Sequence, residues 1–471
     1  MHERELTHTA EEEYQAALDY LYQFVNYERK MTEIYAPEKM DPFRPARLLR
    51  ALGNPHEGFP SIHIAGTKGK GSVSAMCATC LRAAGHSVGL YTSPHLQDLR
   101  ERIRILTPDD EEGLISKAKF AALVEQLKPA VERIGGLTWF ELVTAAAFMH
   151  FEQEAVDVAV VEVGLGGRLD ATNVLTPLVS VITSLSLDHT GLLGNTIESI
   201  AAEKGGIIKE RVPVVSAAQT PGATATLQEI AHRRRTSLTL VERDWQYDGR
   251  TWYEPQHACA QQDVTITKAP EDSLVQAPYT FDLALNGRHQ QHNAVVTLAA
   301  LSQVQDAFPS LSLDALRQGL ASVSWPGRLQ MLLEGPGRPS LLIDGAHNAD
   351  SAQKLASYFQ EMCQFRDLWL VLGITADKNV PGILQPLLPL ARKAFITRAQ
   401  HPRATDVASL KAVAAELGHE VQTEPDIAGA VRAAWQAAAP EDLICVTGSL
   451  YIVGDLLNCW DSLKSALLRD R

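Results

Sequence analysis

A glycine-rich stretch at residues 66–72, with the sequence GTKGKGS, has the composition of a phosphate-binding loop. It follows a short apolar run at residues 61–65 and precedes a helical pattern at residues 73–84. A glycine loop between a strand and a helix turns several backbone N–H groups toward one anion, and the helix dipole and the charge of Lys70 add to the attraction. The stretch is not a strict Walker A loop, because Ile64 stands at the first glycine position and glycine follows the lysine. We predict phosphate binding; the alternative is a glycine-rich turn without a ligand.

Candidate ligands for a metal ion follow other predicted strands. Glu162 lies at the end of the β-branched run at residues 156–163, and the carboxyl ends of such strands are where α/β folds bind ligands. Mg²⁺ prefers oxygen ligands, including those of phosphates, so Glu162 and the hydroxyl of Ser93 suit this ion. His189 is a less usual ligand for Mg²⁺, and a structural histidine is the alternative. For Glu162 the alternative is a helix cap or a salt bridge.

Further polar candidates lie in the last third of the chain. The amide of Asn293, on a predicted helix, can hydrogen-bond nucleotide oxygens, and Arg328 has the guanidinium fork that suits phosphates. Asp344 ends a predicted strand at residues 341–343, and His347 follows shortly after it. The alternatives are a helix surface residue for Asn293, a domain-interface salt bridge for Arg328 and a helix cap for His347.

The overall composition excludes some classes of partner. The 471 residues include 43 Lys or Arg and 56 Asp or Glu, for a net charge of -13. A broad nucleic-acid surface needs a basic face, so we expect no nucleic-acid partner, although a small anionic substrate remains compatible. The amino terminus lacks the apolar core of a signal peptide, and the apolar runs are too short to span a bilayer. We therefore expect a cytoplasmic protein without a membrane partner.

The elements that must position these residues follow an alternating pattern. Val/Ile-rich runs at residues 156–163 and 178–185, separated by helical stretches, predict a parallel sheet covered on both faces. Residues 11–31 predict an opening helix, and residues 240–285 predict a small antiparallel excursion. Cys77 and Cys80 fall on the helix after the glycine loop, and no second pair stands at zinc-site spacing, so we interpret them as buried structural thiols.

A second series of strands and helices begins after residues 325–328. Chains of this length usually form two domains. We predict an α/β fold with a three-layer P-loop mononucleotide-binding domain at residues 1–321 and a smaller Rossmann-like α/β domain at residues 322–471.

Motifs spread from residue 66 to residue 454 resemble those of the Mur ligase superfamily, and specifically its folylpolyglutamate synthase/dihydrofolate synthase branch. The glycine loop is similar to that of the family, with Lys68 where the family usually has Asn. The other similar segments are 93–96 (SPHL), 101–103 (ERI), 138–141 (TWFE), 162–173 (EVGLGGRLDATN), 188–190 (DHT), 193–194 (LG), 203–204 (EK), 289–293 (HQQHN), 325–328 (WPGR), 344–348 (DGAHN), 377–378 (DK) and 448–451 (GSLY).

The resemblance implies a role for each candidate residue. It implies nucleotide contacts from Gly66, Thr67, Gly69, Lys70, Gly71, Ser72, Asn293, Arg328 and Asp344. It implies two Mg²⁺ sites, with Ser93, Glu162, His189 and a carbamylated Lys204 as ligands, and catalytic roles for Lys70, Lys204 and His347. It implies acceptor contacts from Thr138, Phe140, Glu141, Leu169, Asp170 and Ala171. The alternatives are that Asp170 caps the turn before Thr172 and that Lys204 is a surface residue paired with Glu203.

The activity implied by the resemblance is amide formation driven by ATP. A substrate carboxylate is phosphorylated to an acyl phosphate, the amine of L-glutamate attacks, and ADP and phosphate leave. The acceptor is a folate, with dihydropteroate as a second or sole acceptor, the site lies between the two domains, and the protein is expected to be a monomer. Two rivals are a nucleotide-operated switch and a Mur-type ligase that acts on a cell-wall precursor. The segments at residues 93–96, 138–141 and 162–173 favour the folate enzyme over both.

Overall fold

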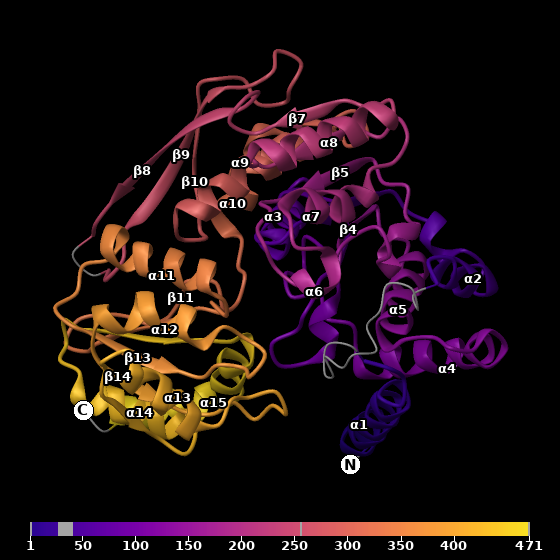
Figure 1. The fold of residues 1–471 in the computed structure, drawn as a ribbon. Coiled ribbons are helices and arrows are strands. Elements are labelled where there is room, and N and C mark those ends of the chain that lie inside the picture. Colours follow the sequence, from indigo (N-terminus) through magenta and orange to yellow (C-terminus); the bar gives the residue numbers. More distant parts are fainter. Residues whose placement is uncertain (1, 27–40, 255–256, 470–471) are drawn as a thin grey trace. The chain divides into compact units, whose positions relative to one another are not determined.

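The computed structural model describes residues 2–26, 41–254 and 257–469, with the side chains of residues 2–8 left aside. Contacts between Cα atoms divide the chain into two compact units. The first comprises Met1–Asp248, Val264–Leu283 and His289–Val323, and the second comprises Gly249–Asp263, Ala284–Arg288 and Ser324–Arg471. Figure 1 shows both units in sequence colours.

The first unit is built on a seven-stranded sheet with the order β3-β2-β4-β1-β5-β6-β7. The strands are β1 (Ser61–Ala65), β2 (Val88–Tyr91), β3 (Ile103–Leu106), β4 (Val158–Glu162), β5 (Val179–Ile182), β6 (Val214–Ser216) and β7 (Leu238–Leu240). All neighbouring pairs are parallel except β2 and β3, which run antiparallel. The predicted α/β class is confirmed, and the predicted parallel sheet is mixed, because β3 joins it antiparallel at one edge.

The central strands are buried along their whole length, as their continuous apolar sequences predict. The helices of this unit are α1 (His2–Leu21), α2 (Arg44–Ala51), α3 (Lys70–Ala83), α4 (Lys117–Ile134), α5 (Trp139–Gln153), α6 (Thr190–Leu193), α7 (Ile197–Lys204), α8 (Pro221–Arg233), α9 (Arg288–Ser302) and α10 (Leu313–Ser322), with short 3-10 turns η2 (Pro55–Glu57), η3 (Leu99–Arg102), η4 (Ala171–Val174) and η5 (Gly205–Ile207). The first residue of α9 belongs to the second unit.

The opening helix is shifted from its prediction. It ends at Leu21, and residues 22–26 form turns, bends and a single bridge. The remainder of the predicted helix, residues 27–31, lies outside the described residues. Within α1, the apolar side chains of Tyr14, Ala17 and Leu21 are buried.

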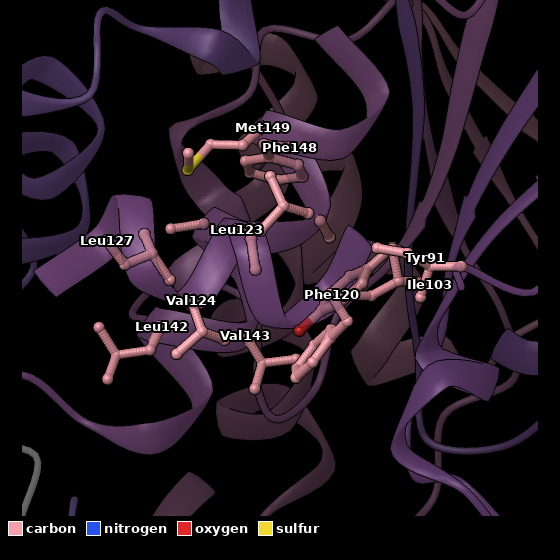
Figure 2. Packing of buried hydrophobic residues seen from close by; sticks show 14 of the residues in the cluster. Tyr91, Ile103, Phe120, Leu123, Val124, Leu127, Leu142, Val143, Phe148 and Met149 are labelled. Carbon is pink, nitrogen blue, oxygen red and sulfur yellow. The ribbon is translucent and has the colours of Figure 1, made fainter. Parts of the chain in front are cut away.

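One core cluster of the first unit joins α4 and α5 to the sheet. Figure 2 shows Phe120, Leu123 and Val124 of α4 packed near Val143 and Phe148 of α5. Tyr91 of β2 and Ile103 of β3 lie beside them. This cluster anchors α5, whose first turn carries candidate acceptor residues. Elsewhere in the unit, Cys77 and Cys80 of α3 are free and fully buried, as interpreted from the sequence.

Residues 246–282 hold a three-stranded sheet with the order β10-β9-β8, where β8 is Gln246–Trp252, β9 is Gln261–Lys268 and β10 is Tyr279–Asp282. This is the segment in which we expected an excursion from the βα pattern. The chain passes from the first unit to the second within β8, and back again within β9.

The second unit contains a six-stranded sheet with the order β11-β12-β16-β13-β14-β15. Only the pair β11–β12 is antiparallel; the other pairs are parallel. Its strands are β11 (Gln330–Leu333), β12 (Ser340–Ile343), β13 (Leu368–Leu372), β14 (Ala391–Ile396), β15 (Val421–Thr423) and β16 (Leu443–Thr447). Its helices are α11 (Ala349–Met362), α12 (Val380–Leu387), α13 (Val407–Glu416), α14 (Ile427–Ala437) and α15 (Leu450–Arg469), with the turn η6 (Leu388–Leu390). Among the described residues, no helix combines the length and apolar character needed to cross a bilayer.

Candidate active site

The glycine loop connects β1 to α3, as predicted. Its backbone is held by the loop that follows β5, because the N–H groups of Thr67 and Lys68 donate to the carbonyl of Ser184 at 3.0 and 3.1 Å. Gly69 has a φ of 89°, in the left-handed region that favours glycine. A Cβ at Gly69 would stand 2.5 Å from Oδ1 of Asn293, so the close approach of α9 also requires glycine here.

Side chains of α9 extend this contact. Asn293 Nδ2 donates to Gln290 Oε1 at 2.9 Å, and Gln290 Nε2 donates to Ser72 Oγ at 3.2 Å. The structure therefore brings Asn293 together with Gly69 and Ser72, which are separated from it by more than two hundred residues. Gln290 belongs to a segment that resembles the family, but the sequence reasoning did not select it as a site residue.

An ion pair between the half-buried Lys70 and the buried Glu162 lies at the loop. The Lys70 ammonium is 3.7 Å from Oε1 of Glu162, whose side chain is 4% exposed. Oε2 of the same carboxylate accepts a hydrogen bond from the backbone N–H of Ser93 at 3.1 Å. Lys70, Glu162 and Ser93, three predicted site residues from three different segments, thus form one group.

Asp188 connects a second set of charged residues. Its Oδ2 is 3.3 Å from the Lys68 ammonium, and its Oδ1 accepts from the backbone N–H of His189 at 2.9 Å. Nε2 of His189 lies 3.8 Å from Oδ1 of Asp188. His189 has a φ of 50°, which is uncommon for a residue other than glycine. The pair between Lys68 and Asp188 was not foreseen, because nothing local in the sequence connects the two residues.

Lys204, at the end of α7, is only 4% exposed. Burial and, to a smaller extent, the charge of Lys70 lower the pKa of its ammonium to about 7, although Asp188 and Asp170 oppose the shift. The alternative of a surface lysine paired with Glu203 is wrong, because Glu203 pairs with Arg168 at 2.8 Å and Lys204 is buried.

Two candidate acceptor residues stabilise the start of α5. The hydroxyl of Thr138 accepts from the N–H of Glu141 at 3.3 Å, and the Glu141 carboxylate accepts from the N–H of Thr138 at 2.6 Å, which is a capping box. Arg44 of α2 binds both oxygens of Glu141, at 2.8 and 3.0 Å. Phe140 points to the loop after β4, since a Cβ at Gly164 would lie 2.4 Å from its ring. The Glu141 carboxylate therefore makes structural contacts with Thr138 and Arg44.

Asp170 organises the loop that follows β4. Its Oδ1 accepts from the N–H and the hydroxyl of Thr172 at 3.0 and 2.5 Å, and its Oδ2 accepts from the N–H of Leu165 at 3.0 Å. Burial raises the pKa of Asp170 although these donors act in the opposite direction. Asp170 caps η4, as the alternative interpretation of this residue stated. Leu169 is half-buried and Ala171 is buried beside it.

In the second unit, three further candidates lie close together. Asp344 follows β12, and its two oxygens accept from the N–H groups of Leu329 and Ala346 at 3.0 and 2.9 Å. A Cβ at Gly345 would lie 2.6 Å from Nη1 of Arg328, and Nδ1 of His347 lies 2.8 Å from the carbonyl of Gly345. Burial raises the pKa of Asp344, and Arg328 opposes the shift. The residue that caps α11 is Asn348, not His347.

Comparisons with known proteins agree with this geometry. Residues 64–301 match the family model of the Mur ligase middle domain, and residues 327–450 match the model of the Mur ligase glutamate ligase domain. A protein of Bacillus subtilis named "Dihydrofolate synthase/folylpolyglutamate synthase" is 33% identical over 425 residues, which cover 88% of this chain and 93% of that protein. The chain belongs to the folylpolyglutamate synthase/dihydrofolate synthase family of Mur ligases.

Two further relatives extend the comparison. A Haloferax volcanii protein named "Probable bifunctional folylpolyglutamate synthase/dihydropteroate synthase" is 36% identical over 422 residues, covering 88% of this chain but only 48% of that protein. The chain thus spans about half the length of this relative. The solved structure "Mycobacterium tuberculosis Folylpolyglutamate synthase complexed with ADP" is 32% identical, with a TM-score of 0.81 over 96% of this chain and 99% of that one.

The donor set of this family member fits Mg²⁺ in its chemistry. Glu162 and the Ser93 hydroxyl are oxygen donors beside Lys70, and Mg²⁺ typically takes one or two carboxylates and completes its shell with phosphate oxygens and water. In the described parts of the chain, no three or more His, Cys, Asp or Glu side chains are grouped to hold a metal by themselves.

Proposed function

We propose that this chain is an ATP-dependent ligase that adds L-glutamate to folates, and that dihydropteroate is a second acceptor. The observation that carries the proposal is the pair formed by Lys70 of the glycine loop and the buried Glu162, 3.7 Å apart, in a chain that belongs to this family. The relative from Bacillus subtilis carries both activities in its name, which supports the second acceptor.

In the proposed reaction the glycine loop binds the phosphates of ATP. Backbone N–H groups around Gly66, Gly69 and Gly71 and the Lys70 ammonium neutralise the charge that develops on the transferred phosphoryl group. Glu162, Ser93 and His189 are the proposed ligands of Mg²⁺. When bound, Mg²⁺ would supply further neutralisation of phosphate charge. The related structure from Mycobacterium tuberculosis is named as a complex with ADP, which supports nucleotide binding by this chain.

The chemistry forms one amide bond for each ATP consumed. The acceptor carboxylate takes the γ-phosphoryl group and releases ADP. The neutral amine of L-glutamate then attacks the acyl carbon, and phosphate leaves. Protein groups mainly position the reactants and offset charge in such a reaction. Lys204 is proposed to act as its carbamate, and His347 is proposed to assist near the reacting phosphate.

The remaining contacts follow the resemblance to the family. Asn293, Arg328 and Asp344 are proposed to contact the nucleotide. The acceptor is proposed to lie against Phe140, Leu169 and Ala171, with Asp170 and the Thr138–Glu141 capping box shaping that surface. The two proposed domains are residues 1–321 and 322–471, and a monomer in the cytoplasm is the proposed state.

An assay of ADP release tests the function. Purified protein is supplied with ATP, Mg²⁺ and L-glutamate, and with a tetrahydrofolate, dihydropteroate or a cell-wall nucleotide as acceptor. We expect ADP release only when glutamate and a folate or dihydropteroate are both present. Steady ATP turnover that ignores both would favour the nucleotide switch, and turnover with the cell-wall nucleotide alone would favour the other ligase.

A further inference from the structure

A histidine stands in the middle of the central strand of the first sheet. His63 belongs to β1, where it is in register with Val161 of β4 on one side and Ser180 of β5 on the other. Its side chain is completely buried. Burying an imidazole in a sheet of Val, Ile and Ala is unfavourable unless the ring makes a hydrogen bond, so its partner indicates what the residue does.

The ring has one hydrogen-bond partner in the described part of the chain, the hydroxyl of Thr172. Nε2 of His63 lies 2.8 Å from Thr172 Oγ1, and Nδ1 has no hydrogen-bond partner among the described residues. Burial and, to a smaller extent, the charge of Lys209 lower the pKa of His63 to about 3, so the ring is neutral at ordinary pH. A neutral imidazole carries one N–H, which belongs on one of these two nitrogens.

The direction of the hydrogen bonds follows from Asp170. Oγ1 of Thr172 is 2.5 Å from Oδ1 of Asp170, and an ionised carboxylate can only accept. The Thr172 hydroxyl therefore donates to Asp170, and its oxygen accepts from Nε2–H of His63. This places the proton of His63 on Nε2 and leaves Nδ1 as a bare lone pair.

The chain of hydrogen bonds ends in the loop after β4. Asp170 Oδ2 accepts from the N–H of Leu165 at 3.0 Å, which closes the turn between Leu165 and Asp170. Thr172 is completely buried and Asp170 is 9% exposed, so water does not compete strongly for these bonds. A rigid central strand is thereby connected to a loop that contains candidate acceptor contacts.

We propose that His63 is a positioning residue for the acceptor site: its Nε2–H orients the Thr172 hydroxyl, which holds Asp170 and through it the loop at residues 164–171. The inference rests on the proposed function, in which Leu169, Asp170 and Ala171 form part of the acceptor surface. His63 itself does not touch the acceptor. Its effect is on the shape of the loop, which must be set before the acceptor binds.

Substitutions that keep or remove the N–H test this role. The amide of Gln reaches a position similar to that of imidazole Nε2 and can donate, whereas Leu fills the space without a donor. We expect His63→Leu to raise KM for the folate acceptor about tenfold, as loss of one hydrogen bond to a positioned group implies, with kcat and KM for ATP within about threefold of the parent. His63→Gln is expected to restore KM to within about threefold.

A matched control separates positioning from general loss of stability. His150 of α5 is also buried and also has an Nδ1 without a hydrogen-bond partner among the described residues, and burial lowers its pKa to about 4. His150→Leu is expected to alter thermal stability and leave KM for the acceptor unchanged. Equal rises of KM in His63→Leu and His150→Leu would overturn the proposal, and so would a parental KM in a folded His63→Leu variant.

A double-mutant cycle tests the connection through Thr172. Thr172→Val removes the hydroxyl but keeps the shape of the side chain. Because His63 acts through this hydroxyl, the rise of KM in the double variant His63→Leu/Thr172→Val should equal that of Thr172→Val alone. Rises that multiply would mean that His63 acts independently of Thr172 and would overturn the proposal.

Nitrogen-15 NMR of the histidine rings gives a readout that does not need activity. We expect the resonance of His63, identified by its loss in His63→Gln, to show the neutral Nε2–H form across neutral pH and to shift in Thr172→Val. An Nδ1–H form or an imidazolium would overturn the proposal. A parent protein without folate-dependent ADP release would overturn the proposed function instead, and the NMR result would still decide whether His63 donates to Thr172.

Discussion

The Lys70 ammonium lies 3.7 Å from Oε1 of Glu162, at the point where the glycine loop meets the end of β4. Oε2 of Glu162 also accepts from the backbone N–H of Ser93, so one buried carboxylate contacts both a lysine of the glycine loop and the segment after β2. The ion pair with Lys70 and the hydrogen bond from Ser93 both depend on the negative charge of Glu162. A neutral side chain of the same shape would weaken both contacts.

We therefore expect Glu162→Gln to lower kcat for ADP release by about 100-fold or more, the usual cost of removing a group that stabilises developing charge. The amide keeps the volume of the carboxylate, so the fold should persist. The measurement is steady-state ADP release, with circular dichroism to confirm folding. The control is Glu203→Gln. Glu203 lies on α7 and pairs with Arg168, and this variant should stay near parental activity. A kcat for Glu162→Gln within a few-fold of the parent would refute the assignment.

For Glu141 we predict an effect on stability, because its carboxylate makes structural contacts. It completes the capping box of α5 and binds Arg44 of α2. Glu141→Gln should destabilise the protein by about 1–3 kcal/mol, since the cap is weakened and the Arg44 guanidinium loses its charged partner. Thermal unfolding measures the loss. Thr138→Ser, which keeps the capping hydroxyl, should remain close to the parent. A Glu141→Gln variant of parental stability would refute this structural role of the carboxylate.

The second acceptor is tested by growth. Asp170 and its neighbours form a hydrogen-bonded loop, and in the proposed function this loop is part of the acceptor surface. We expect the chain to support growth of a bacterial strain that lacks dihydrofolate synthase. Asp170→Ala should not support growth, because the loop loses the acceptor for Thr172 and Leu165. Absence of growth with the parent chain, expressed at a normal level, would mean that the enzyme extends folates only.

Local sequence patterns predicted the position of the glycine loop well. The strand, the loop and the helix at residues 61–84 are contiguous, so their order is determined by short-range pattern and glycine placement. The direction of β3 and β11 was not predictable in this way, because strand pairing depends on partners elsewhere in the chain. The same holds for the end of the opening helix at Leu21, where apolar spacing continued into residues that are not helical.

Tertiary pairing also explains the site residues that sequence reasoning missed. His63 looked like one more residue of an apolar strand, and its role appears only when Thr172 is placed 2.8 Å away. Gln290 and Lys68 are similar cases, because their partners Ser72 and Asp188 lie on other segments. By contrast, Glu162 could be selected in advance, since the carboxyl end of a central strand is a position where ligands gather.

The pH dependence of stability follows from Lys204. The pKa of Lys204 is about 7 in the folded protein, against an ordinary value of 10.5, because burial disfavours the charged amine. Between these two values only the unfolded chain binds the proton, so the free energy of unfolding rises with pH across this window, and below pH 7 the cost of the buried charge is fully present.

In buffer free of CO₂, the unfolding free energy of the parent should thus rise relative to Lys204→Met by roughly 1 kcal/mol for each pH unit above neutrality. Urea titrations at a series of pH values, from neutral to mildly alkaline, measure the difference. The variant should be the more stable protein at neutral pH. A constant difference between parent and variant across this range would show that the Lys204 amine titrates normally.

The last prediction is that Lys204 carries CO₂ as a carbamate. The reaction needs a neutral amine, which a pKa of about 7 makes abundant at physiological pH, and it converts the side chain into an anion with two oxygens. The charges of Lys70 and Lys68 oppose an ammonium at this position and favour an anion, while Asp170 and Asp188 act in the other direction. The carbamate is therefore best stabilised when a divalent ion shares its oxygens.

We expect Lys204→Ala to lose about 100-fold or more in kcat, and short-chain carboxylates to restore part of the activity by supplying the missing oxygens. The matched control is Lys209→Ala. Lys209 is another lysine whose pKa is lowered by burial, to about 8, but its ammonium donates to the carbonyl of Asn173 at 2.6 Å and has no implied role in catalysis. Carbon-13 NMR of the parent in labelled bicarbonate should show a carbamate signal that is absent from Lys204→Ala and present in Lys209→Ala. Near-parental activity of Lys204→Ala would show that a carbamate at this residue is not needed for catalysis. If carboxylates raised the activity of Lys204→Ala and Lys209→Ala equally, the rescue would not be specific to residue 204, and this too would contradict the proposal.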